Sequence, residues 1–470
     1  MSRGADLTIL GGGPAGLAVA RYAQAAGLSF VLLEKSAELG GLCRTFACGE
    51  HRYDSGAHRF HDRDPGITAD VRSWLGDELL TVRAPSQIWH RSQFIDFPPS
   101  PLNWIRSQGW LEGARTAFEI AATRLRPRPE RTFEDLAINR YGRRLGKPLL
   151  LDYSEKLWGL PAAELAIDVA TRRLSGLGLT TLLFEVILPR RKTRHLDGEF
   201  FYPRNGYGMI AERMAAELPR EQLRMRHEVT GFEFDDKRVN GVRCADGSVV
   251  PVGGRVVNTL PLTIVARFLG ETLPESARRA AAALSFRHVR IVFLRLCIPR
   301  CTDNATIYLP DPRLAISRIS EPRNRSAALA PDGETSLVAE IPCSTGDSLA
   351  LLTDEALAAR VIDELEGVGL IERRSVVEWR CHFLPNAYPV YSLGYRELLA
   401  EVEHGVAGVR NLDLLGRGGR FWYSHLHDQL RAAKDYVRSF VASTGAETEA
   451  GSDLSPSIAA HILRSATKLQ

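Results

Sequence analysis

The sequence predicts an α/β protein of two lobes, in which a Rossmann-like domain is interleaved with a domain of helices and antiparallel strands. Three observations support this fold class. A glycine-rich turn near the N-terminus stands between two short apolar segments. Alternating strand patterns return after residue 228 and again after residue 286. The length of 470 residues also exceeds what one hydrophobic core usually covers.

The composition is that of an ordinary globular protein, with 44% hydrophobic and 25% charged residues. The formal net charge of +4 and the lack of a long Lys/Arg block argue against a nucleic-acid partner. Seven cysteines, without a CxxC pair or histidines at zinc spacing, predict reduced thiols and no metal site. We see neither a signal-peptide pattern nor an apolar run of ~18 residues, and therefore expect a cytoplasmic protein.

The N-terminal turn has the spacing of a dinucleotide-binding motif. Residues 7–10, LTIL, predict a strand that enters GGGPAG, and the helical pattern after it ends at Gly27 before the apolar segment FVLLEK. Gly11 permits the tight turn, Gly13 lets the backbone approach a pyrophosphate, and Gly16 allows close helix–strand packing. The helix N-terminus then favours the phosphate charge.

The second strand ends at Glu34, where a carboxylate can bind both ribose hydroxyls of an adenosine. A further glycine pair, Gly40 and Gly41, and Arg44 follow at once. They offer more backbone N–H groups and a cation to the pyrophosphate. This extension resembles the FAD-binding flavoprotein oxidases, and a simple NAD dehydrogenase would not need it. The sequence therefore predicts FAD as the cofactor.

The rest of the chain predicts how the two domains alternate. A capping box from Thr132 to Asp135 opens a helical stretch, and segments 228–250 and 286–341 predict strands. The FAD-binding domain is predicted to comprise residues 1–95, 215–270 and 385–442. Residues 96–214 and 271–384 are assigned to the substrate domain, and residues 443–470 to a mobile polar tail.

Four further segments carry a family resemblance. They are YDSGAHRFHD (53–62), YSEKLWGLPAAEL (153–165), FFYPRNGYGMIAERM (200–214) and GRGGRFWYSHLHD (416–428). They resemble, in order, the G-x-H-x-F-H, Y-x-E-K-x-W-G, Y-P-x-x-G-x-G and terminal G-R segments of one superfamily. This is the FAD-containing amine oxidase, protoporphyrinogen oxidase and UDP-galactopyranose mutase group, with the mutase-like flavoproteins nearest. The resemblance implies a two-lobe α+β flavoprotein.

The resemblance also implies functional residues. The expected cofactor contacts are Gly11, Gly13, Pro14, Ala15, Gly16, Glu34, Lys35, Gly41, Leu42, Arg44, His58, Val229, Gly416, Arg417 and His427. The expected substrate contacts are Tyr153, Trp158, Arg172, Arg318 and Tyr423, and the expected catalytic residues are His58, His425, His427 and Arg417.

Several of these residues have plainer interpretations. Tyr153, Trp158 and His58 could be core, and Arg172 could lie on a solvated helix face. Arg318 lies on a predicted strand, where a buried arginine needs an anionic partner that could be a substrate phosphate or a glutamate.

One departure from the family pattern concerns the reaction. An ungapped alignment from Arg417 places His427 where the mutases carry an aspartate near the flavin, and Asp428 comes one residue later. A histidine there changes the field on the ring and could donate a proton.

We therefore expect an FAD-dependent oxidoreductase acting on a phosphorylated small molecule, a nucleotide- or lipid-linked sugar. The alternative is a non-redox mutase that uses reduced FAD as a nucleophile through N5, and a third possibility is a flavin-binding protein without activity. The segment LTTLLFEVILPRRK (179–192) is apolar and then basic, which predicts peripheral contact with the inner face of the membrane. The oligomeric state is not readable from the sequence.

Overall fold

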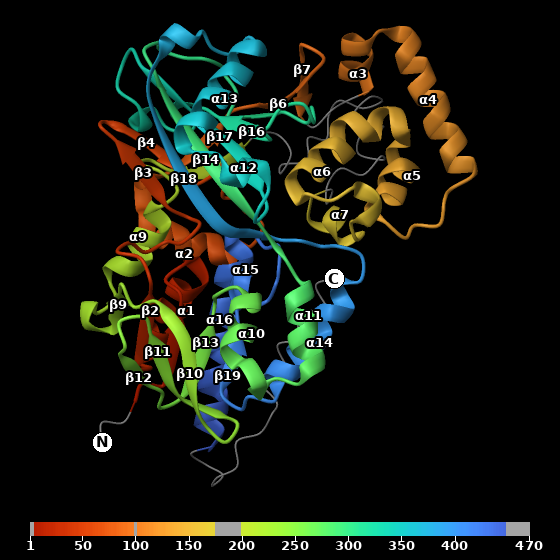
Figure 1. The fold of residues 1–470 in the computed structure, drawn as a ribbon. Coiled ribbons are helices and arrows are strands. Elements are labelled where there is room, and N and C mark those ends of the chain that lie inside the picture. The colour runs from red at the N-terminus through yellow and green to blue at the C-terminus, as the bar shows by residue number, and fades with distance from the viewer. Residues whose placement is uncertain (1–3, 98–100, 174–198, 448–470) are drawn as a thin grey trace.

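The computed structural model describes residues 4–97, 101–173 and 199–447, which form two lobes (Figure 1). The first lobe is built on a five-stranded parallel sheet in the order β19-β13-β1-β2-β9. Its strands are β1 (Leu7–Leu10), β2 (Phe30–Glu34), β9 (Leu223–Met225), β13 (Arg255–Asn258) and β19 (Leu412–Leu414). The parallel sheet confirms the predicted Rossmann-like core.

The turn between β1 and α1 (Pro14–Ala25) requires glycine, which has no side chain, at position 16. All four residues of β1 are buried, as expected for a strand covered on both faces. Gly11 has a φ of +99°, and Pro14 opens the helix at a position that needs no N–H. A Cβ on Gly16 would lie 2.0 Å from the carbonyl oxygen of Gly11. Glycine at this position therefore lets α1 pack directly on the end of β1.

Helices cover the parallel sheet and connect it to smaller sheets. α1 packs against α9 and α16, and α2 packs against both α9 and α16. The helices of this lobe are α2 (Pro65–Leu75), α9 (Met209–Ala216), α10 (Leu262–Leu269), α11 (Glu275–Ala283), α14 (Tyr395–Ala407), α15 (Gly416–Gly419) and α16 (Leu426–Glu447). A three-stranded antiparallel sheet consists of β10 (Val229–Asp235), β11 (Arg238–Cys244) and β12 (Val249–Pro251).

The second lobe contains a seven-stranded sheet in the order β18-β14-β17-β16-β15-β6-β7. The strands are β6 (Ser86–His90), β7 (Gln93–Phe97), β14 (Phe286–Leu296), β15 (Thr306–Tyr308), β16 (Arg318–Ser320), β17 (Thr335–Cys343) and β18 (Val376–Pro389). All pairs are antiparallel except β6 with β15. β17 is buried throughout, and α13 (Asp354–Gly367) packs against β14 and β18. The short helix α12 (Ser348–Leu351) contacts β17.

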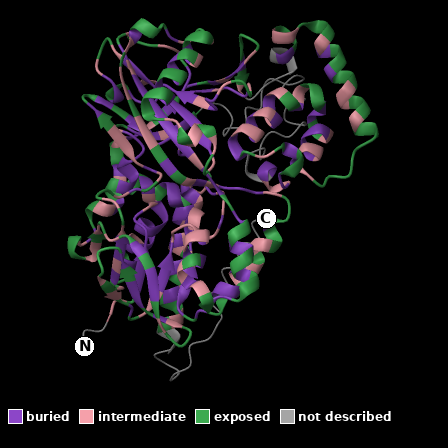
Figure 2. Ribbon diagram, viewed as in Figure 1, coloured by how far each residue is buried: buried purple, intermediate pink, exposed green. Residues whose placement is uncertain are grey.

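A helical part flanks this sheet (Figure 1). It consists of α3 (Pro101–Gln108), α4 (Trp110–Leu125), α5 (Phe133–Gly146), α6 (Asp152–Trp158) and α7 (Asp168–Arg173). The predicted capping box is present: the Thr132 hydroxyl accepts from the Asp135 N–H, and the Asp135 carboxylate accepts from the Thr132 N–H. Figure 2 shows burial concentrated in the two large sheets and exposure along α4.

Some segments lie elsewhere than the predicted division assigns them. β6 and most of β7 fall in segment 1–95 but pair within the seven-stranded sheet. β8 (Glu199–Pro203) pairs instead with β5 (Leu79–Arg83). Strand partners are chosen by long-range packing, which a local pattern does not specify. Most of α9 and all of α11 also fall in segments assigned to the substrate domain, but they pack on helices of the first lobe. The rest of the division stays a prediction.

The predicted tail begins at 443, but α16 continues to Glu447. The residues that follow it, and the amphipathic segment 179–192, lie outside the described residues. Within the described ranges, no helix is long and apolar enough to cross a membrane.

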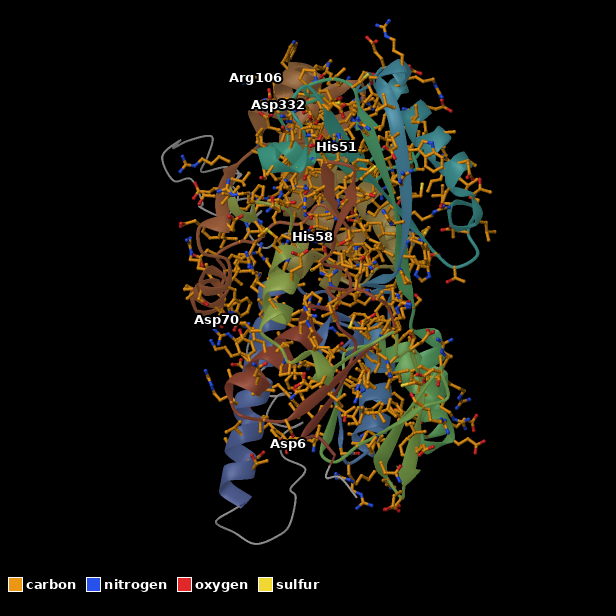
Figure 3. All side chains as sticks on the ribbon, turned by 90° about the vertical axis from the view of Figure 1, so that its left-hand side faces the viewer. Asp6, His51, His58, Asp70, Arg106 and Asp332 are labelled. Carbon is orange, nitrogen blue, oxygen red and sulfur yellow. The ribbon has the colours of Figure 1, made fainter. Side chains whose placement is uncertain are left out.

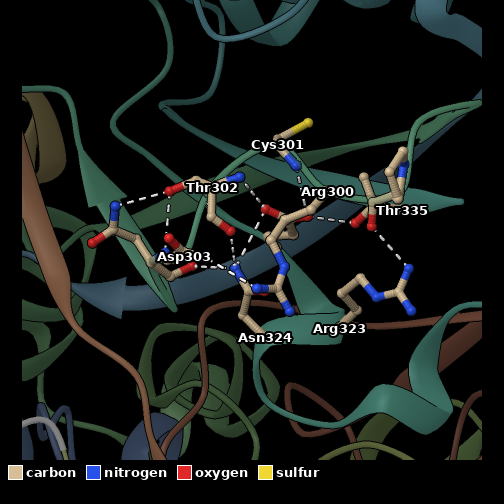
Figure 4. A network of polar contacts seen from close by, with 10 residues as sticks. Arg300, Cys301, Thr302, Asp303, Arg323, Asn324 and Thr335 are labelled. Carbon is tan, nitrogen blue, oxygen red and sulfur yellow. Dashed lines mark hydrogen bonds and ion pairs between the residues drawn. The ribbon is translucent and has the colours of Figure 1, made fainter. Parts of the chain in front are cut away.

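A buried carboxylate organises the loop that leads into β15 (Figure 4). Glu321 is fully buried and accepts hydrogen bonds from the backbone N–H groups of Cys301 and Thr302 and from the Thr335 hydroxyl. The Asn324 amide donates to the carbonyls of Thr302 and Asn304. These bonds satisfy the buried charge and fix the start of β15, whose residues Thr306 and Tyr308 face the site described next.

Candidate active site

A cavity of about 380 Å³ lies between the two lobes. Figure 3 shows His58 at mid-height of the molecule, between Asp6 of the parallel-sheet lobe and Arg106 of α3. The predicted site residues that line the cavity are Gly11, Gly13, Pro14, Ala15, Glu34, Gly41, Leu42, His58, Arg318, Arg417, Tyr423 and His425. The fold thus brings together residues that are as much as four hundred positions apart in the sequence.

One end of the cavity is formed mostly by backbone. Gly13 and Gly41 both line it, and a Cβ on Gly41 would lie 3.0 Å from the Cα of Gly13. Glu34 Oε2 accepts from the Gly12 N–H at 2.7 Å, and Oε1 accepts from the N–H and hydroxyl of Ser36 at 2.8 Å. These bonds hold the carboxylate at the end of β2. Oε2 accepts only one of these bonds and so retains a lone pair that could accept from a ribose hydroxyl.

Six expected cofactor contacts do not line the cavity, and one of them, His427, is described below with His425. Arg44 donates to the Gly41 carbonyl at 3.1 Å and lies 3.6 Å from Glu38, so it supports the glycine pair from behind. Lys35 is exposed, Val229 is buried at the start of β10, and Gly16 packs against the β1–α1 turn. The fifth, Gly416, contacts Ala15, because a Cβ there would lie 2.7 Å from the Ala15 Cβ.

The His58 loop is anchored to the other lobe. The Ala57 N–H donates to Glu340 Oε1 at 2.7 Å, and His58 Nε2 lies 3.3 Å from the Ser55 hydroxyl. The imidazole stacks on Tyr207, with ring centroids 4.8 Å apart. Burial and the nearby guanidinium groups of Arg318, Arg325 and Arg417 lower the pKa of His58 to about 3. His58 is therefore neutral at physiological pH.

The anionic partner of Arg318 is a glutamate. The sequence alone leaves open whether this partner is a glutamate or a substrate phosphate. Its guanidinium lies 2.7 Å from Glu340 Oε2 and 3.3 Å from the Tyr388 hydroxyl. Its Nε is buried without a hydrogen-bond partner in the described structure. Arg318 thus ties β16 to β17 while facing the cavity, and its predicted substrate contact remains a prediction.

Arg59 is a cavity residue that the sequence analysis missed. It occupies the open position of the G-x-H-x-F-H segment and donates to the Ser86 and Thr306 hydroxyls. No carboxylate lies within 4.0 Å of it among the residues that the structure describes. Burial lowers the pKa of Arg59 to about 10, a shift that Tyr308 opposes and that Arg325 and Arg318 increase.

Arg417 likewise has no carboxylate partner within the described ranges. Its Nη1 donates to the Ala387 carbonyl at 3.2 Å, Nη2 donates to the Ser424 carbonyl, and Nε is buried without a partner. The guanidinium lies over the rings of Tyr388 and Tyr423. Four arginines line the cavity, Arg59, Arg63, Arg318 and Arg417, and among the described residues only Arg318 is paired with a carboxylate, that of Glu340.

Two of the other expected substrate contacts, Tyr153 and Trp158, do not line the cavity. Trp158 is 1% exposed and packs against Tyr388, Tyr391 and Tyr423, as the core interpretation predicts. Tyr153 packs edge-on against Tyr308. Arg172 belongs to α7, but its side chain lies outside the described residues. Trp158 and Tyr153 thus support the aromatic wall from outside.

His425 and His427 occupy different environments at the start of α16. His425 lines the cavity, and its buried Nε2 has no hydrogen-bond partner among the residues described. Burial and the charges of Arg63, His427 and Arg417 lower its pKa to about 3. His427 does not line the cavity but stacks on His425, with centroids 5.6 Å apart. Asp428 accepts from the His425 N–H at 2.8 Å and so caps α16.

The remaining lining residues were not predicted. They are Cys43, Ala57, Arg59, His61, Arg63, Tyr207, Thr259, Leu260, Pro261, Tyr308, Pro385, Asn386, Tyr388, Gly418, Leu426 and Gln429. Proximity to a motif could have suggested those next to His58 and Arg417. The residues of β15 and β18 carry no such signal, because only tertiary pairing brings them to the cavity.

The fold and cavity define a two-lobe flavoenzyme, with a glycine turn at one end and arginines and tyrosines at the other. The family model for flavin containing amine oxidoreductases matches residues 14–405. The chain therefore belongs to this family, which confirms the predicted superfamily and a flavin-dependent enzyme.

Solved structures with this fold include three of different function. Reduced UDP-galactopyranose mutase is 18% identical, with 98% of each chain covered and a TM-score of 0.83. A putative protoporphyrinogen oxidase from Exiguobacterium sp. 255-15 is 21% identical, with 92% of this chain and 98% of that chain covered and a TM-score of 0.72. Wild-type putrescine oxidase bound to putrescine is 17% identical over 93% and 99%, with a TM-score of 0.65. Identities this low establish the shared fold alone.

The residues at the backbone-lined end fit the flavin cofactor that the family implies. The cavity continues without side-chain obstruction past Gly13 and Gly41, where any Cβ would narrow it. Helix α1 begins at this end without a side-chain cap, a position that favours a bound phosphate, and Glu34 lines the same end. At the other end, His58 and Tyr207 form a stacked pair beside His425.

Proposed function

We propose that the protein is an FAD-dependent oxidoreductase whose substrate is a phosphorylated, nucleotide- or lipid-linked sugar held between the lobes. The observation that carries the proposal is Arg59, a cavity arginine without a carboxylate partner in the described part of the chain. Keeping such a cation away from water is unfavourable unless an anion joins it. Arg417 and the open Nε of Arg318 supply further donors at the same end.

Each protein group has a distinct task in this proposal. Bound FAD would supply hydride transfer. Arg59 and Arg417 would bind the anionic group and orient the sugar, since guanidinium forks match phosphate oxygens. An anion bound there would offset the positive charges that lower the pKa of His58, so substrate binding would make His58 a better proton acceptor. Glu340 would keep the His58 loop in place through the Ala57 N–H.

The mutase alternative uses the same cofactor and the same arginines. It differs from the oxidoreductase in that no net electron transfer occurs between flavin and sugar. The test is to reduce the purified holoenzyme anaerobically and to add nucleotide sugars and lipid-linked sugars while recording flavin absorbance. Stoichiometric return of the oxidised spectrum supports the oxidoreductase. Isomerisation of a sugar while the flavin stays reduced identifies a mutase, and a protein that binds no added FAD contradicts both.

A substitution tests the anion site separately. Arg59→Met is expected to raise the KM or Kd for the phosphorylated ligand about 10- to 100-fold, as for the loss of a charged hydrogen bond. Flavin content should not change, because Arg59 lies at the other end of the cavity. Arg72→Met is the matched control: Arg72 lies over Phe201 as Arg59 lies over Phe200, but it is exposed on α2. Equal effects of the two variants would contradict the proposed site.

A further inference from the structure

Helix α4 exposes an apolar face that the proposed function does not use. Of the twelve exposed large hydrophobic side chains in the described residues, five fall within 105–125. Trp110, Leu111, Phe118 and Leu125 are 77%, 50%, 78% and 84% exposed. Soluble proteins seldom expose so many large apolar groups on one element without a partner for them.

These residues form one continuous face. Leu111, Phe118 and Leu125 follow each other at seven-residue intervals and so lie along one line of the helix. The exposed positions between them are alanines, apart from Arg115 and Arg124. The exposed face of α4 therefore has apolar and basic residues and no acidic ones. We call it the α4 face.

The acidic residues of α4 are turned inward. Glu112 lies 2.6 Å from Arg144 of α5, and the Glu119 carboxylate accepts from the N–H groups of Arg143 and Arg144. On the inner side, Trp104 donates to the buried Thr116 hydroxyl. The orientation of α4 is thus fixed by polar contacts to α3 and α5, which hold the apolar face toward solvent.

Basic side chains surround the face. Arg124 ends α4, and the exposed loop RPRPER after it adds Arg126, Arg128 and Arg131. The same loop contains one exposed acidic residue, Glu130. Arg115 lies 3.7 Å from Glu112, whereas no ion pair is found for Arg124 or the three loop arginines among the described residues. Because α4 lies at the outer edge of the helical part (Figures 1 and 2), no other described element covers it.

We infer that the α4 face docks on the surface of a bilayer containing anionic phospholipid. An amphipathic helix with aromatic and leucine side chains on one face and arginines beside them lies in the interface between headgroups and acyl chains. Each arginine near an anionic surface adds to the attraction. A second copy of the chain fits less well, because a symmetric contact would bring Arg115 and Arg124 of both copies together. The inference does not depend on the substrate proposed above.

The experiment is flotation of the purified holoprotein with vesicles of phosphatidylcholine alone or mixed with phosphatidylglycerol. We expect strong binding to the mixed vesicles, weaker binding to phosphatidylcholine, and weakening with salt. Phe118→Glu and Leu125→Glu should each reduce the affinity about 10- to 100-fold, from the lost burial of one large apolar side chain. Leu351→Glu is the matched control, because Leu351 is 74% exposed on α12.

Flavin absorbance and circular dichroism verify that the variants are folded, since both changed side chains are exposed. The inference is wrong if wild-type protein does not float with the mixed vesicles, or if Phe118→Glu floats as well as wild type. It is equally wrong if the protein is a dimer that Phe118→Glu separates while neither form binds vesicles, because the face is then an interface between copies.

Discussion

The two ends of the cavity are built in opposite ways. At the cofactor end, the wall is mostly backbone from the β1–α1 turn and from the loop around Gly41, with Glu34 as its charged side chain. At the substrate end, the wall is side chains from β15, β16, β18 and the loops before α2 and α16. Of the four arginines there, Arg59, Arg63, Arg318 and Arg417, only Arg318 has a carboxylate partner among the described residues, namely Glu340.

The structure of the cofactor end thus depends on local backbone geometry, whereas that of the substrate end depends on the balance of charges. The cofactor end tolerates no added side chain, whereas the substrate end contains an excess of cations. A fold can keep that excess only if each arginine has neutral acceptors and an anion joins when the site is used. We therefore expect added side chains to impair the cofactor end. At the substrate end, removing a charge should destabilise the protein at some arginines and not at others.

The largest expected effect is a difference in the free energy of unfolding between substitutions of two arginines of the substrate end, Arg318 and Arg59. Arg318→Met leaves Glu340 buried without its cation, so the free energy of unfolding should fall by about 3–5 kcal/mol. Arg59→Met leaves no carboxylate unpaired, so its change should stay within about 1 kcal/mol. Urea denaturation of the two variants measures this difference. Equal losses would show that Arg59 is structurally paired after all.

A smaller effect is expected at the cofactor end. The new methyl group of Gly16→Ala would lie 2.0 Å from the Gly11 carbonyl oxygen and push α1 away from β1. Overpacking of this kind destabilises by about 1–3 kcal/mol, and the displaced helix N-terminus should lose its flavin. Gly367→Ala is the control, because no atom lies within 4 Å of the added Cβ. Retained flavin in Gly16→Ala would show that the turn tolerates side chains.

The same contrast explains how much the sequence could predict. The glycine turn, Glu34 and the strand on each side are contiguous, so spacing alone predicted their structure. The partner of Arg318 could not be chosen, because Glu340 reaches it only through the pairing of β16 with β17. Arg59 was missed because the family pattern leaves its position open, and Tyr308 and Tyr388 because no motif adjoins them. His427 was placed at the flavin by an ungapped alignment, whereas the turn before α16 directs His425 to the cavity.

The smallest effect concerns the two neutral histidines of the substrate end, His58 and His425. The pKa of His425 in the folded protein is about 3, and that of an unfolded histidine is about 6.5. Between these values the unfolded chain binds more protons, so the free energy of unfolding falls as the pH falls. From pH 7 to pH 6 the loss is at most about 0.7 kcal/mol for each such histidine.

Replacing His425 with glutamine should therefore flatten the pH dependence of unfolding over this interval, and replacing His58, with a pKa of about 3, should do the same. Urea denaturation at several pH values measures the slope. His404→Gln is the matched control, since that imidazole is exposed on α14 in the folded protein. An unchanged slope in both cavity variants would mean that these imidazoles titrate in the folded protein as they do in the unfolded chain, and that the cavity does not keep them neutral.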